Sequence, residues 1–389
     1  MSTNLTELAE PDTKEGAVAR GALLKSVAFV ATCLFGAVIL FLLFEGLGNT
    51  LFIIHDYVSY WGHVVDMEHS TQFDPELGWV NIPNFYSKDF YDPGIYVQTN
   101  SRGFRNQEEF ALQVPAAKLR VICSGDSFTF GVGVDNDHTW CEQLSSLDHR
   151  LQTVNMGVPG YGADQMYLLQ LRETSRLDYD VQIFAVITDD FRRMMKGNLL
   201  GYGKPMLALR GDELVTTHVP VQKSSVFTRW IFWTGKFKSV AMLQRVGGKL
   251  QPARRYDANL IATITRNTQQ VTAKVLENLQ ATDRHKNSVM VVLLLPTFDE
   301  LTATGPSAAW RDFLRDESAK QGITFIDLLD DAKKLPISEL EKLFIPNGSQ
   351  RYSDTGGHLT DYGNEYVSRK VYQALTANPE VASRLSTLR

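Results

Sequence analysis

Apolar residues follow two different periods between Leu119 and Leu375. Short continuous apolar runs are typical of strands buried on both faces of a parallel sheet, whereas apolar residues three and four positions apart are typical of helices that cover it. The two patterns alternate, which predicts a doubly wound, mostly parallel α/β sheet. We expect strands at residues 119–124, 151–156, 181–187, 288–295 and 323–328, and helices at residues 139–148, 163–176, 262–283, 307–321 and 358–375.

An apolar segment near the N-terminus has a different character. The residues from Ser26 to Phe44 carry no charge, and at about 1.5 Å per residue such a helix nearly spans a hydrocarbon core of ~30 Å. A cleaved signal peptide is the alternative, but its apolar part is usually only about 7–15 residues long. Glu45-Gly-Leu-Gly is also a poor cleavage site. We therefore expect an uncleaved transmembrane anchor over residues 26–47.

Basic residues around this segment predict its orientation. Lys14, Arg20 and Lys25 precede it, and the next lysine or arginine after it is Lys88. The positive-inside rule then places the N-terminus in the cytoplasm. We expect residues 1–25 to form a disordered cytoplasmic tail. The rest of the chain should lie outside the cytoplasmic (inner) membrane, in a periplasm or its equivalent.

Two regions interrupt the regular alternation. Residues 48–115 combine a juxtamembrane segment with a lead-in in which Pro, Gly and Asn mark turns, so we expect a small β-rich structure there. It should pack on the main domain, residues 116–389. Within that domain, residues 198–256 form an insertion that is long for a connection.

The insertion combines basic and aromatic residues. Lysines and arginines, but no acidic residue, lie between Glu213 and Asp257, and Trp230-Ile-Phe-Trp233 lies among them. One interpretation is a helix whose aromatic residues reach the core. The other is an amphipathic element that faces a membrane or an anionic polymer.

Composition and charge exclude several functions. The chain has 389 residues, 44% of them hydrophobic and 21% charged, and a net charge of −5, which does not favour nucleic-acid binding. The eight histidines are scattered and neither CxxC nor HExxH is present, so we expect no metal and no cofactor. Cys123 and Cys141 could form a disulfide, because Cys33 lies in the apolar segment. Both also suit positions for small buried hydrophobic residues.

A serine follows the first predicted strand at its carboxyl end, where open α/β sheets place their ligands. It belongs to Gly125-Asp126-Ser127, and Asp354-Thr-Gly-Gly-His358 lies far downstream. Acyl transfer needs a nucleophile, a base and a group that orients the base. Ser127, His358 and Asp354 are the candidates for these roles. The ordinary alternatives are a serine in a strand-to-helix turn and a histidine that caps a helix.

These blocks and Asn155-Met-Gly-Val-Pro-Gly160 resemble the GDSL or SGNH hydrolase family in their order and spacing. The turns between residues 73 and 104 resemble the lead-in of membrane-anchored members. The resemblance implies an SGNH-like fold and a Ser–His–Asp acyl-enzyme mechanism without a cofactor. It also implies an oxyanion hole formed by the main-chain N–H groups of Ser127 and Gly160.

The chain departs from the family pattern in the block that contains His358. The usual spacing is Asp-x-x-His, whereas three residues separate Asp354 from His358 here. The loop must therefore bulge if Asp354 is to reach the imidazole. Asp361 is the rival candidate for orienting the base, but we expect it to lie within the following helix and to point away.

A second departure concerns the oxyanion hole. After the strand that ends at Ile187, family members usually carry Asn-Asp, and the asparagine amide donates to the oxyanion. This chain has Thr188-Asp189-Asp190. An ionised Asp189 cannot donate, so it could serve only if its pKa were raised; alternatively, Arg192 or Arg193 holds it as a structural anion. Loss of one oxyanion donor typically costs ~100–1,000-fold in turnover.

These observations lead to one functional expectation and two alternatives. We expect a membrane-anchored, extracytoplasmic serine esterase or acyltransferase that acts on ester groups, O-acetyl groups above all, of a glycan. A membrane-bound acyl donor or an exporter would be a compatible partner. The first alternative is an SGNH-fold protein of weak or no activity that serves in polysaccharide binding or assembly. The second is a lipid-directed esterase.

Overall fold

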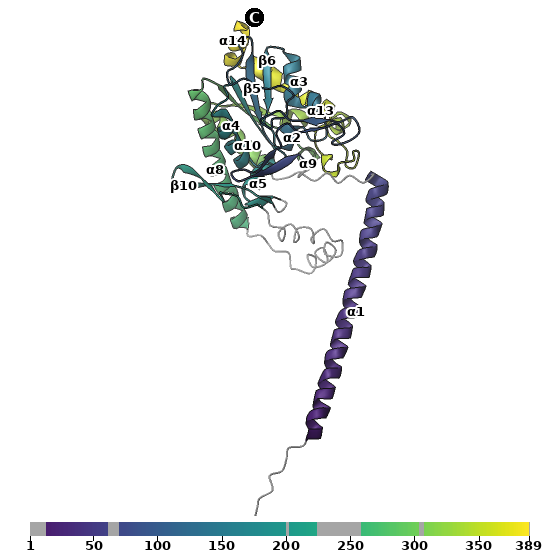
Figure 1. Cartoon of the computed structure of the whole chain (residues 1–389). Coiled ribbons are helices and arrows are strands. Elements are labelled where there is room, and N and C mark those ends of the chain that lie inside the picture. Colours follow the sequence, from purple (N-terminus) through teal and green to yellow (C-terminus); the bar gives the residue numbers. More distant parts are fainter. Residues whose placement is uncertain (1–12, 61–69, 200–201, 224–257, 303–306, 389) are drawn as a thin grey trace, which may run out of the picture. The chain divides into compact units, whose positions relative to one another are not determined.

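The structure is a computed structural model that describes residues 13–60, 70–199, 202–223, 258–302 and 307–388 (Figure 1). The N-terminal helix belongs to one compact unit, and the sheets belong to another. The basic and aromatic part of the insertion, residues 224–257, lies outside the described residues.

Five parallel strands in the described part of the chain form one sheet in the order β13-β12-β7-β5-β6. The order runs outwards in both directions from β5, the first of these strands in the sequence, as the predicted doubly wound fold requires. The central strands are buried along their whole length because helices cover both faces. Their bounds are β5 Leu119–Ser124, β6 Leu151–Asn155, β7 Val181–Val186, β12 Val289–Leu294 and β13 Thr324–Asp327.

The helices form two layers around this sheet (Figure 1). Successive strand residues face opposite layers, so that Ile122 packs with one core cluster and Val121 with the other. One layer contains α4 Ala163–Thr174, α8 Ala258–His285 and α10 Ser307–Gln321. The other contains α3 Trp140–Leu147, α11 Leu328–Ala332, α13 Asp361–Ala377 and α14 Pro379–Thr387.

Short elements connect the layers at the carboxyl ends of the strands. They comprise α2 Ser127–Phe130, α5 Thr188–Met194, α9 Phe298–Thr302, α12 Ile337–Leu340 and the 3₁₀ helices η2 Asn136–His138, η3 Glu341–Leu343 and η4 Ser353–Thr355. The lead-in is β-rich, as predicted. It pairs β1 Thr71–Asp74 with β2 Gly78–Asn81, and β3 Tyr86–Ser87 with β4 Val97–Gln98. The start of the insertion adds β8 Asn198–Leu199 with β9 Tyr202–Gly203, and β10 Met206–Arg210 with β11 Glu213–Thr217.

The N-terminal helix α1 spans Thr13–Tyr60. Its segment Gly21–Gly46 has a mean hydropathy of 2.8, so it is long and apolar enough to cross a membrane; an anchor and a signal sequence both have this character. Leu34 and Phe35 on this segment are 63% and 68% exposed.

Three sequence predictions need correction or completion. Residues 13–25 are helical rather than disordered, because good helix formers there continue the apolar helix. The helix predicted to begin at His358 begins at Asp361, since Thr360 caps it by accepting from the Gly363 N–H. The possible disulfide is absent: Cys123 and Cys141 are both free and buried.

Candidate active site

Ser127 begins the one-turn helix α2 directly after the buried strand β5. Asp126 caps this helix, its Oδ1 accepting from the Phe128 N–H at 2.9 Å. Gly131 ends it in the left-handed region, with φ 83°, where its N–H donates to the Ser127 carbonyl. The turn fixes the Ser127 hydroxyl at the carboxyl edge of the sheet, with 8% of the residue exposed.

Two glycines allow the surrounding loops to approach this turn. A Cβ on Gly125 would lie 2.0 Å from the Thr129 hydroxyl, and one on Gly157 would lie 2.2 Å from the Phe130 nitrogen. Neither contact is possible for a side chain, so both positions require glycine. At Gly157 the loop after β6 therefore approaches α2 closely.

Main-chain donors are available next to the hydroxyl. The loop after β6 runs beside the nucleophile turn, and the Val158 N–H donates to the Gly125 carbonyl at 3.1 Å. Gly160 in this loop has φ 79°, which favours glycine. Within the described residues, no acceptor takes the N–H of Ser127 or of Gly160. Both groups are therefore free to donate to an oxyanion, the role predicted for them.

His358 lies opposite Ser127. Its Nε2 is 2.9 Å from the Ser127 Oγ, and its Nδ1 is 3.2 Å from the Thr355 carbonyl oxygen. A carbonyl can only accept, so Nδ1 carries the proton and Nε2 is left to accept from the serine hydroxyl. Burial lowers the pKa of His358 and outweighs the opposite effects of Asp126 and the Thr355 carbonyl. The imidazole is thus neutral near pH 7, as a general base must be.

The loop that carries His358 is fixed at both ends. The Ile345 N–H donates to the His358 carbonyl, and the Gly357 N–H donates to the Ile345 carbonyl, both at 2.8 Å. Gly357 has φ 81°, so the Gly-Gly pair accommodates the extra residue in a left-handed turn. Asn364 accepts from the Trp140 N–H at 2.9 Å and donates to the Thr360 carbonyl, which ties the start of α13 to the start of α3.

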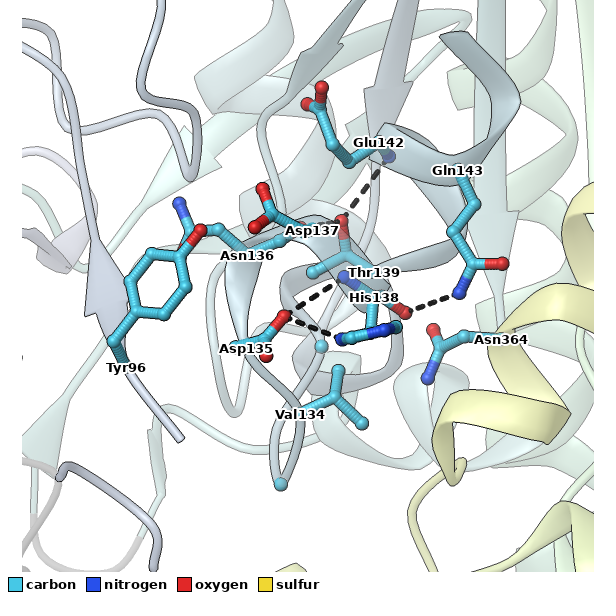
Figure 2. A network of polar contacts seen from close by, with 12 residues as sticks. Tyr96, Val134, Asp135, Asn136, Asp137, His138, Thr139, Glu142, Gln143 and Asn364 are labelled. Carbon is cyan, nitrogen blue, oxygen red and sulfur yellow. Dashed lines mark hydrogen bonds and ion pairs between the residues drawn. The ribbon is translucent and has the colours of Figure 1, made fainter. Parts of the chain in front are cut away.

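Figure 2 shows the polar turn that precedes α3, with Asn364 nearby. His138 in this turn contacts Asp135 through its Nδ1 at 2.8 Å. Burial lowers the pKa of His138, but the Asp135 contact and the charge of Asp361 outweigh it and raise the pKa above its usual value. Asp361 lies at the first position of α13, as predicted, and its charge acts on His138.

Asp354 lies in η4, in the turn that precedes His358, and its side chain is on the exposed side of this turn. Its charge raises the pKa of His358, but less than the charge of Asp126 does. The hydrogen bond seen at Nδ1 is the one to the Thr355 carbonyl. The role of Asp354 in orienting the imidazole stays a prediction.

Asp189 lies in the first turn of α5, half exposed. Its Oδ1 is 3.2 Å from Arg192 Nη1, and the two side chains are 48% and 70% exposed. Arg192 therefore pairs with Asp189, one of the contacts considered from the sequence. Arg193 makes different contacts, to Asp126 and Asp190.

The lead-in supplies residues that sequence reasoning missed. Arg105 is fully buried, and its guanidinium donates to the carbonyls of Phe130, Gly131 and Val134 at 2.9, 2.7 and 2.6 Å. It thereby holds the end of the nucleophile helix. Asn81 donates to the Gly157 carbonyl at 3.0 Å, and Trp79 donates to the Pro159 carbonyl at 3.0 Å. The lead-in thus fixes both main-chain parts of the candidate oxyanion hole.

A cavity of about 680 Å³ lies beside the His358 loop, although neither Ser127 nor His358 lines it. Its walls come from the segments that follow Ser127 and flank His358, including Val134, Phe344 and Ile345. Glu341, Lys342 and Asp361 add charge to the lining. No group of metal-ligating side chains occurs among the residues described by the structure.

The chain was compared with curated proteins and with solved structures. No match was found among the curated proteins. Solved structures of similar fold include a lipolytic G-D-S-L protein from Veillonella parvula DSM 2008, with 14% identity, a TM-score of 0.37, and coverage of 67% of this chain and 99% of that one. A catalytic mutant of an acetylxylan esterase from Geobacillus stearothermophilus has 9% identity, a TM-score of 0.35, and coverage of 67% and 96%.

The sequence itself gives the assignment. A model of the GDSL-like lipase/acylhydrolase family matches residues 123–366, which is more than half of the chain. This match begins in β5, includes Ser127 and Gly160, and ends after His358. The chain therefore belongs to the GDSL-like lipase/acylhydrolase family.

Proposed function

We propose that this protein is a membrane-anchored serine esterase or acyltransferase that acts outside the cytoplasm on ester groups, O-acetyl groups above all, of a glycan. The observation that carries the proposal is the 2.9 Å contact between Ser127 Oγ and His358 Nε2, formed by residues 231 positions apart in the sequence. A hydroxyl in contact with a neutral, oriented imidazole is the arrangement that nucleophilic acyl transfer needs.

The chemistry follows from these positions. His358 Nε2 takes the Ser127 proton as Oγ attacks the ester carbonyl carbon, and the oxygen that gains negative charge accepts from the N–H groups of Ser127 and Gly160. When the tetrahedral species collapses, the ester C–O bond breaks and the departing alkoxide takes the proton from His358. Water or a sugar hydroxyl then attacks the acyl carbon and gives its proton to His358. The bond between the acyl carbon and Ser127 Oγ breaks, Oγ takes the proton back from His358, and the acid or the acylated sugar leaves.

The charged residues of the cavity beside the site support a glycan substrate, although most of the cavity lining is apolar. Glu341, Lys342 and Asp361 line the cavity next to the His358 loop. An acyl chain placed there would remove water from these charges without replacing its hydrogen bonds, whereas sugar hydroxyls can replace them. The N-terminal helix and its flanking basic residues support an anchor with the enzyme domain outside the cytoplasm.

A product assay tests the substrate class. Full-length protein in detergent is incubated with O-acetylated polysaccharides and, separately, with phospholipid vesicles, and released acetate and fatty acid are measured. We expect acetate release that is lost in Ser127→Ala. Fatty-acid release that depends on Ser127 would instead establish the lipid-directed alternative. Absence of Ser127-dependent products from both substrates and from a small activated acetate ester would contradict the enzymatic proposal and favour polysaccharide binding or assembly.

Topology has its own test. We expect alkaline extraction to leave the full-length chain in the membrane fraction, and a protease added outside the cytoplasmic membrane to digest the domain from residue 70 onwards while an N-terminal tag stays protected. Release of a shortened soluble chain would show that the apolar helix is a cleaved signal sequence.

A further inference from the structure

Arg193 in α5 contacts two loops of the site and a carboxylate on its own helix through a single nitrogen. Its Nη1 donates to Asp126 Oδ2 at 3.0 Å, to the Tyr161 carbonyl at 2.9 Å and to Asp190 Oδ1 at 2.8 Å. Asp126 lies in the turn after β5, Tyr161 lies in the loop after β6, and Asp190 lies with Arg193 on α5, which follows β7. Ser127 follows Asp126, Gly160 precedes Tyr161, and Asp189 precedes Asp190.

The two carboxylates that face Arg193 are buried and already engaged. Their side chains are 1% and 0% exposed, against 18% for Arg193. Asp126 Oδ1 caps α2, and Asp190 Oδ2 accepts from the Ile187 N–H at 2.9 Å. Two buried carboxylates this close repel each other unless a cation lies between them. Burial and the charge of Asp126 raise the pKa of Asp190, and Arg193 opposes this rise.

The same group of charges reaches the catalytic pair. Asp126 Oδ2 is 3.4 Å from Ser127 Oγ. Burial is the main influence that lowers the pKa of His358. The charges of Asp126 and Asp354 raise it, as does the Thr355 carbonyl, and the charge of Arg193 lowers it. Arg193 thus offsets the strongest negative charge that acts on the imidazole.

We propose that Arg193 is a positioning residue. It ties α5, which carries Asp189, to the segments after β5 and β6 that carry Ser127 and Gly160, and it balances the charge of Asp126 beside the nucleophile. This inference rests on the proposed function and concerns the same site. The contacts of Arg193 keep α5 aligned with the rest of the site, although Asp189 on the same helix is half exposed and paired with Arg192.

Three variants of the full-length protein in detergent test the proposal. Arg193→Gln removes the charge, and Arg193→Lys keeps it but loses the planar guanidinium. Arg311→Gln is the matched control, because Arg311 also bridges two carboxylates, Asp327 and Asp330, and is 20% exposed, yet lies on α10. The measured quantity is the rate at which an activated phosphonate labels Ser127, followed by intact mass from pH 5 to pH 9.

We expect Arg193→Gln to label about 100-fold more slowly than the unmodified protein, since small misplacements of reacting groups have effects of this order. The acidic side of the pH profile of its labelling rate should also move to higher pH, because no charge of Arg193 then opposes the effect of Asp126 on the pKa of His358. Arg193→Lys should label about tenfold more slowly with the acidic side of the pH profile unmoved, since the charge is kept but the shorter side chain does not bring its nitrogen to the position of Nη1. Arg311→Gln should change neither quantity. Labelling of Arg193→Lys at the unmodified rate would overturn the positioning role, and it decides the question if Arg193→Gln does not fold.

A second measurement separates this inference from the proposed function. The His358 imidazole is titrated by NMR in full-length protein with isotope-labelled histidine, which needs no activity. We expect a higher pKa of His358 in Arg193→Gln than in the unmodified protein, in Arg193→Lys and in Arg311→Gln. An equal pKa in all four proteins overturns the charge-balancing role, even if Ser127 is never labelled. If the phosphonate does not label Ser127 of the unmodified protein, that result contradicts the proposed function and not the role of Arg193.

Discussion

The nucleophile side and the β7 side of this site are held in very different ways. Ser127 and the Gly157–Gly160 loop are fixed by buried contacts from the lead-in, among them the fully buried Arg105. Asp189 instead lies at the surface and has one ion pair, with the largely exposed Arg192. The comparison teaches that the main-chain groups predicted to form the oxyanion hole are held by buried contacts. The position where the family carries its side-chain donor is half exposed here.

The largest expected effect on the rate of ester hydrolysis is that of replacing His358, the predicted base. We expect His358→Gln to reduce hydrolysis of a small activated acetate ester by about 10⁴-fold, because glutamine cannot take the Ser127 proton. His138→Gln is the control, since His138 is exposed and contacts Asp135 instead (Figure 2). It should change the rate by less than about twofold. Activity of His358→Gln within tenfold of the unmodified protein would contradict the assignment of the base.

A second prediction tests the contribution of the lead-in. Arg105→Lys should lower the free energy of unfolding by about 3 kcal/mol, because lysine cannot satisfy all the carbonyls that the guanidinium contacts and buried groups would lose their partners. Arg102→Lys should cost less than about 1 kcal/mol, because the Arg102–Glu173 pair is partly exposed. Denaturant unfolding of the full-length chain measures both. Equal effects would show that the lead-in does not support the nucleophile turn.

On the β7 side, Asp189→Asn should increase the rate of Ser127 labelling by roughly tenfold, because an amide can donate where the carboxylate repels the developing charge. Asp189→Ala removes the charge without adding a donor, so the difference between the two variants isolates the amide. A rate for Asp189→Asn no higher than for Asp189→Ala would show that the side chain does not reach the oxyanion.

The smallest expected effect is on the pH dependence of ester hydrolysis. Burial lowers the pKa of His358 below its usual value of 6.5. The imidazole therefore stays neutral, and able to accept a proton, at pH values where an ordinary histidine is already protonated. The rate of ester hydrolysis should thus reach half of its plateau value at a pH below 6.5. An acid limb centred at or above pH 6.5 would contradict the environment described for His358.

Elements with continuous apolar sequence were the ones that could be predicted. Strands β5, β7 and β12 and helix α10 agree with the sequence interpretation within one residue, because burial on both faces or a regular apolar period leaves little choice of structure. The start of α13 was wrong by three residues. The helix period alone does not show where a cap lies, and the signal was present in Thr360, three residues before Gly363.

The site was predictable in its motifs but not in its supports. Ser127 and His358 were found from short blocks, and the structure brings them together. Arg105 was missed because its partners are main-chain carbonyls more than twenty residues away, which leave no pattern in the sequence. The one local signal for a buried Arg105 was its place directly after the apolar Phe104, in a segment whose sequence has neither a helix period nor a strand period.

The most direct test of the account is the labelling of full-length protein in detergent by an activated, serine-directed phosphonate, read by intact mass. We predict a single adduct in the unmodified protein and none in Ser127→Ala, with Ser124→Ala, a second buried serine at the end of β5, labelled like the unmodified protein. An unmodified protein that takes no adduct between pH 5 and pH 9, or that keeps its adduct in Ser127→Ala, would contradict the claim that the Ser127–His358 pair is a working nucleophile and base.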